Sequence, residues 1–76
     1  LAGDDAERAA AIELAVSETD ASFPAGNPVI ALAVEAAGRN DAAFCNQLLA
    51  AVQAGNFEET TDYINIVKIL EGIANE

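Results

Sequence analysis

Apolar residues recur with helical spacing in four segments of this 76-residue chain, and turn-forming residues separate the segments. The predicted helix starts are marked by capping residues: Asp4 with Glu7, Asn27 before Pro28, Asn40, and Asn56 with Glu59. Gly38 and Gly55 are placed to end the second and third helices. We therefore predict an all-α fold, a compact bundle of four short helices over about 5–19, 28–37, 41–54 and 57–74, in a single domain.

Each predicted helix has an apolar face that would contribute to the core. The face of the first is narrow (Ala9, Ile12 and Val16), and Leu14 falls on its exposed side. The third helix has an apolar arc of Phe44, Cys45, Leu48, Leu49, Ala51 and Val52. The fourth has the widest stripe, about 160° against the roughly 100° of an ordinary surface helix. It comprises Tyr63, Ile66, Val67, Ile69, Leu70, Ile73 and Ala74.

Two segments also fit a β-strand. Residues 29–34 form a short apolar run, in which periodicity does not separate helix from strand. Residues 63–69 are rich in β-branched side chains, which favour strands. The caps and glycines around both segments favour helices, so the strands stay as alternatives.

The hydrophobic fraction of 53% overstates how much core the chain can build, because 18 of the 40 hydrophobic residues are alanines. Only 22 side chains can fill much of a core, and no disulfide is available because Cys45 is the one cysteine. A domain of this size and composition is expected to be marginally stable alone.

Charge is unevenly distributed along the chain. The formal net charge is −10, from 13 acidic and 3 basic residues. Three cations cannot form a basic surface, so no nucleic-acid partner is expected. Residues 21–57 carry a net charge of only −1, and 42–57 carry none. Either the two middle helices form the centre of the bundle, or the third presents an uncharged face to a partner.

Residues that carry catalysis are largely missing. The chain has no histidine, and Cys45 lies on an apolar arc, where a buried structural thiol is expected. Two acidic clusters stand in the first turns of predicted helices, where they favour the helix dipole: Asp4, Asp5 and Glu7, and Glu58, Glu59 and Asp62. We therefore expect no enzyme activity, no cofactor and no specific metal site.

In size, acidity and helical content the chain resembles acyl carrier proteins. That resemblance would imply a phosphopantetheine on the serine of an Asp-Ser-Leu motif at the start of a helix. The chain has no Asp-Ser dipeptide, since Ser17 follows Val16 and Ser22 follows Ala21. The functional motif is missing, and the family is not assigned.

No segment is long enough to span a membrane, because the longest wholly apolar run covers only 29–34. The chain starts at Leu1 and contains no methionine, as expected of a processed product or a partial chain. Such a soluble chain fits an organelle lumen or secretion after processing, and peripheral association with a membrane complex stays open. The sequence does not determine the compartment.

The sequence thus favours a non-catalytic accessory subunit, an acidic helical module that docks onto a larger protein assembly. The predicted partner-binding residues lie on the third and fourth helices: Gln47, Gln53, Ile69 and Ile73. The alternative is a small carrier that holds an apolar ligand or acyl chain between its helices.

Overall fold

The computed structural model describes the backbone of residues 2–75 and the side chains of residues 5–75. It contains four helices, α1 (Ala2–Glu18), α2 (Pro28–Gly38), α3 (Ala42–Ala54) and α4 (Thr61–Ala74). No strand occurs within residues 2–75, so both strand alternatives are wrong and the predicted four-helix bundle is confirmed.

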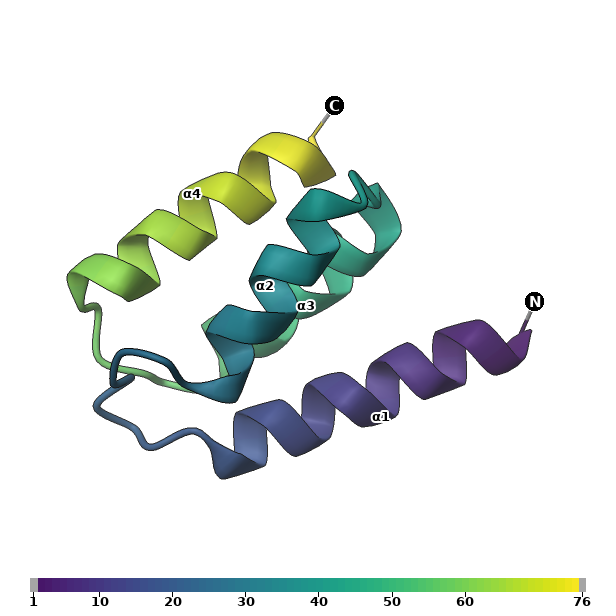
Figure 1. Cartoon of the computed structure of the whole chain (residues 1–76). Helices are drawn as coiled ribbons and strands as arrows, with labels where there is room; N and C mark the ends of the chain where they lie inside the picture. Colours follow the sequence, from purple (N-terminus) through teal and green to yellow (C-terminus); the bar gives the residue numbers. More distant parts are fainter. Residues whose placement is uncertain (1, 76) are drawn as a thin grey trace.

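The helices pack around a central pair. Figure 1 shows α1, α2 and α4 side by side across the front of the molecule, with α3 behind α2. In the described part of the chain, α2 and α3 each pack against all three other helices, whereas α1 and α4 do not touch. Of the two interpretations of the uncharged middle segment, the central position of α2 and α3 is therefore confirmed.

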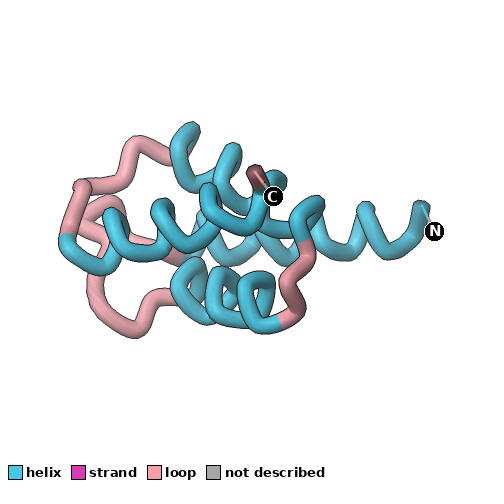
Figure 2. Tube along the Cα trace, turned by 90° about the horizontal axis from the view of Figure 1, so that it is seen from above, coloured by secondary structure: helices cyan, strands magenta, loops and turns pink. Residues whose placement is uncertain are grey.

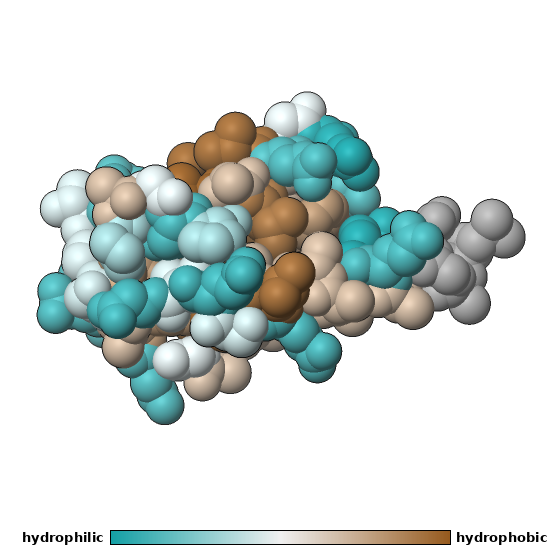
Figure 3. Space-filling view, turned by 60° about the horizontal axis from the view of Figure 1, so that its bottom comes forward, coloured by the Kyte–Doolittle hydropathy of each residue, from teal (hydrophilic) through white to brown (hydrophobic). Residues whose placement is uncertain are grey.

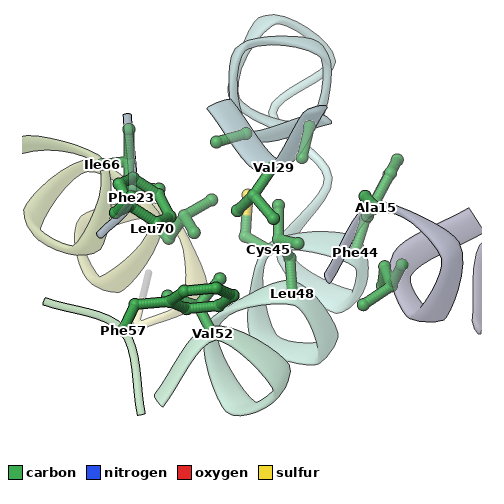
Figure 4. Close-up of a cluster of buried hydrophobic side chains, with 13 residues drawn as sticks. Ala15, Phe23, Val29, Phe44, Cys45, Leu48, Val52, Phe57, Ile66 and Leu70 are labelled. Carbon is green, nitrogen blue, oxygen red and sulfur yellow. The ribbon is translucent and has the colours of Figure 1, made fainter. Parts of the chain in front are cut away.

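One hydrophobic core joins all four helices, and Figure 4 shows its side chains converging from each of them. Five side chains from α2 and α3 are completely buried, namely Val29, Ala36, Cys45, Leu48 and Val52. On α1 the inner face is Ile12 and Ala15, and the predicted inward residue Ala9 is exposed. The first turns of α1 extend beyond the other helices in Figure 2.

The two longer loops meet at one end of the bundle (Figure 2). The Glu58 N–H donates to the Ala21 carbonyl at 2.8 Å, which joins the loop before α4 to the loop before α2. Phe23 lies between the rings of Phe57 and Tyr63, with both centroid distances at 5.3 Å and both contacts edge-to-face. The loops therefore close the end of the core with an aromatic cluster.

Gly55 ends α3 as predicted, and it is also needed for this closure. A Cβ on Gly55 would lie 2.6 Å from the Phe57 ring, so only glycine lets the ring pack there. Its backbone φ of −79° is ordinary, and the left-handed conformation falls on the next residue, Asn56, with φ 54°.

The helix caps agree with the sequence at one start and differ at two. The Asn27 side chain accepts from the Ile30 N–H at 2.9 Å, as predicted. The cap of α3 is Asp41, which accepts from the Phe44 N–H at 3.1 Å, in place of Asn40. The cap of α4 is Thr60 instead of Asn56. The helix starts later there because burial of Phe57 holds the preceding segment outside the helix.

The first helix also begins earlier than predicted. It starts at Ala2, so Asp4 lies within its first turn and not at its N-cap. The predicted side-chain partnership of Asp4 with Glu7 lies outside the described residues, because the structure describes no side chain before Asp5.

Asn40, and not the predicted Gly38, is the residue in the left-handed conformation that ends α2. Its φ is 52°, and the Asp41 N–H donates to the Ala36 carbonyl at 3.3 Å. A residue in the left-handed conformation followed by this hydrogen bond is the Schellman ending of a helix, which asparagine tolerates.

We expect Asn56→Ala to lower the free energy of unfolding by about 1 kcal/mol, because alanine is strained at a positive φ. Asn56→Gly should leave stability unchanged or raise it by up to about 0.5 kcal/mol, because glycine adopts this φ freely. Urea denaturation measures both. A glycine variant less stable than the alanine variant would contradict the left-handed assignment.

Candidate docking surface

Within residues 5–75, large apolar side chains are exposed at four positions, and three of them lie on α2 or beside it. Leu14 of α1 is 60% exposed, Val34 of α2 66% and Ile69 of α4 50%. The fourth, Ile64, is 41% exposed and lines neither of the grooves beside α2. Figure 3, with α1 turned forward, shows hydrophobic side chains in a band across the molecule between hydrophilic areas.

The first groove beside α2 lies between α1 and α2 and has a volume of about 370 Å³. Its lining is mostly apolar, and two carboxylates, Glu18 and Glu35, are its charged residues. The apolar lining residues are Ala11, Leu14, Ala15, Pro28, Ala31 and Leu32. The prediction that Leu14 is exposed is confirmed, and the structure adds that it borders a groove.

The second groove lies between α2 and α4 and has a volume of about 240 Å³. All five of its lining residues are apolar: Ala33, Val34, Ala37, Ile66 and Ile69. We call the exposed and half-buried apolar residues around α2 the α2 face, defined by Leu14, Ala31, Leu32, Val34 and Ile69. The only charged residue of α2 itself is Glu35.

A polar hollow continues the first groove toward α3. It has a volume of about 370 Å³, and it shares Ala11, Leu32 and Glu35 with the apolar groove. Two of the three cations of the chain, Arg8 and Arg39, line it. Both already have carboxylate partners, since Arg8 pairs with Asp5 and Asp41, and Arg39 lies 3.4 Å from Glu35. Such neutralised cations offer little to an anionic ligand.

The structure separates the four residues predicted to bind a partner. Ile69 lines the α2–α4 groove, and Ile73 is half-buried against the core. Gln47 is half-buried on α3, and Gln53 is exposed on the same helix. No residue of α3 lines the groove that contains Ile69, so the structure does not join the glutamines to it.

The exposed side of α3 keeps its uncharged character. Since α3 lies behind α2, this side faces away from the α2 face (Figure 1). It consists of small and amide side chains, namely Ala42, Ala43, Asn46, Ala50, Gln53 and Ala54. The central position of α3 explains its buried arc.

Cys45 has the environment of a structural thiol. It is completely buried in the core beside Val29 and Leu48 (Figure 4). Burial, and to a smaller extent the charge of Asp41, raise the pKa of the thiol. A raised pKa and the lack of access both oppose reactivity.

We expect Cys45 to react with a thiol reagent only as fast as the protein unfolds.

The raised pKa of Cys45 also determines how the stability of the protein depends on pH. The folded state holds the thiol proton more tightly than the unfolded state does. Its contribution to stability is therefore complete below the pH at which the thiol of the unfolded chain ionises, and it decreases as the pH rises above that point. The unfolding free energy should decrease more steeply above that pH than in Cys45→Ala. Equal slopes would contradict this.

The carboxylates of the chain do not form a metal centre in the described part. Within residues 5–75, no group of three His, Cys, Asp or Glu side chains is placed to hold a metal ion. Asp20 instead stabilises a turn, where its carboxylate accepts from the Ser22 N–H at 3.0 Å and from the Ser22 hydroxyl at 2.6 Å. These hydrogen bonds lower the pKa of Asp20.

No protein family model matches this sequence, and no curated protein or solved structure is significantly similar to it. Over residues 2–75, no helix combines the length and apolar character required to cross a membrane. The functional interpretation therefore depends on the chemistry of the surface itself.

Proposed function

We propose that this chain is a non-catalytic accessory subunit that docks onto a larger protein assembly through the α2 face. The observation that carries the proposal is the gathering of Leu14, Val34 and Ile69 around one nearly uncharged helix. Exposed leucines are ordinary when single, but apolar side chains that extend over three adjacent helices are typical of interaction sites.

The grooves on both sides of α2 support the same proposal. An apolar groove beside an exposed helix can receive anchor side chains from a partner. Such anchors supply most of the binding energy of an interface. The acidic residues of α1 around the first groove would form the polar rim that surrounds such a site. A catalytic role finds little support, because the chain has no histidine and its one thiol is buried.

The alternative function is a carrier of a small apolar ligand. The wholly apolar lining of the α2–α4 groove favours it, since a short acyl chain would contact only hydrocarbon there. The space between α2, α3 and α4 is filled by Val29, Leu48 and Leu70, all with 0% exposure, so a ligand would have to lie at the surface. Docking therefore remains the better-supported function.

Native mass spectrometry of the chain from its own source separates the two functions. The docking proposal predicts that the chain occurs in a larger complex and dissociates with its unmodified mass. A monomer of 7.8 kDa plus a small apolar adduct would favour the carrier. A bare monomer under gentle conditions would contradict both.

A further inference from the structure

We infer that the groove between α1 and α2 binds a basic amphipathic helix of a partner protein. The inference rests on the proposed docking function and adds the chemistry of the partner.

The length of the groove suits a helix. The apolar groove and the polar hollow share three lining residues, so they form one continuous trough along α1. On the α1 side the trough extends from Glu7 to Glu18. At 1.5 Å per residue this is about 16 Å, or three turns of a helix laid alongside.

The lining of the trough suits the apolar side of such a helix. Its floor has small side chains, Ala11, Ala15 and Ala31, which allow another backbone to approach closely. Leu14 and Leu32 provide larger apolar contacts beside that floor. An apolar groove with these dimensions is filled by side chains spaced three and four residues apart on a partner helix.

The charges around the trough determine which polar residues the partner helix should carry. Glu7, Glu18 and Glu35 line the trough together with two cations, Arg8 and Arg39. Arg8 pairs with Asp5 and Asp41, and Arg39 pairs with Glu35 at an exposed site, so both cations are neutralised. Within residues 5–75, Glu7 and Glu18 make no ion pair. Unpaired carboxylates beside an apolar floor complement a helix whose apolar residues are flanked by Lys or Arg. The same charges oppose a second copy of this chain, because two surfaces would meet with a net charge of −10 each.

A direct test uses an amphipathic peptide of Leu and Lys, about 18 residues long so that it forms a helix, labelled for fluorescence anisotropy. It should bind the whole chain with a Kd on the order of 10 μM at low salt. Glu18→Gln with Glu35→Gln should weaken binding about tenfold, since two carboxylates at the groove are lost. The control pair, Glu13→Gln with Glu58→Gln, removes the same charge away from the groove and should change the Kd less than about twofold.

Three results would overturn the inference. Equal weakening by both pairs would mean that the peptide responds only to overall charge. Equal binding of a Leu/Gln peptide would assign the groove to an uncharged apolar segment. Reversible dimerisation that the peptide abolishes would assign it to a second copy of the chain.

The inference and the proposed function can fail separately. If the Leu/Lys peptide does not bind but Ile69→Asp still removes the chain from its assembly, docking stands and the basic helix is wrong. If the peptide binds as expected and Ile69→Asp has no effect, the groove assignment stands and docking across the whole α2 face is wrong.

Discussion

Replacing Phe23 by alanine is expected to lower the free energy of unfolding by about 3–5 kcal/mol. The side chain is 1% exposed and makes edge-to-face contacts with both Phe57 and Tyr63, which join the two loops to α4. A chain of 76 residues has a total stability of about 4–11 kcal/mol. The variant should therefore be largely unfolded in mild urea, as far-UV circular dichroism would show.

Leu14→Ala serves as the control for this prediction. It also removes a large apolar side chain, but this one is 60% exposed, so stability should change by no more than about 0.5 kcal/mol. A Phe23→Ala variant as stable as Leu14→Ala would mean that the loops do not close the core as described.

Ile69→Asp is expected to weaken binding to the larger assembly by at least about 30-fold, the effect of losing an interface anchor. The carboxylate would be placed beside an apolar groove, where the assembly would have to remove it from water. Stability should change little, because Ile69 is already 50% exposed. The affinity is measured by rebinding the purified variant to assembly depleted of this chain.

The matched control is Ile64→Asp, with the same substitution on the same helix. Ile64 is 41% exposed but lines neither groove beside α2, so its effect on binding should be below about twofold. Equal losses in the two variants would show that added charge on α4, and not the α2 face, is responsible.

The elements that the sequence predicts well depend on local interactions. Asn27 caps α2 as expected because its cap bond joins it to Ile30, three residues away. The buried arc of α3, from Phe44 to Val52, follows directly from helical spacing. Patterns of this range are visible in a single sequence.

The errors at helix ends have a tertiary cause. Asn56 and Glu59 have the spacing of a capping pair at a helix start. In the structure Phe57 packs over Gly55 and against Phe23, which is 34 residues away in the chain. That contact keeps the segment outside the helix, and Thr60 caps α4 instead. No local pattern shows that a loop phenylalanine belongs to the core.

The candidate site was predicted only in part for a similar reason. Spacing on α4 places Ile69 in an over-wide apolar stripe, but it does not tell which helix lies beside it. The charge pattern groups Ile69 with Gln47 and Gln53 of α3, whereas in the structure Ile69 lines a groove with Val34 of α2. One feature of the sequence does point to this surface: α2 is apolar along its length and has a single charged residue, Glu35.

Photo-crosslinking from position 34 tests docking through the α2 face most directly. The chain carries a photoreactive amino acid in place of Val34, or of Ile64 as the control, and is illuminated in its native source. Docking through the α2 face predicts one defined crosslinked subunit from position 34 and little or none from position 64. Equal crosslinking from both positions, or none from position 34, would contradict it.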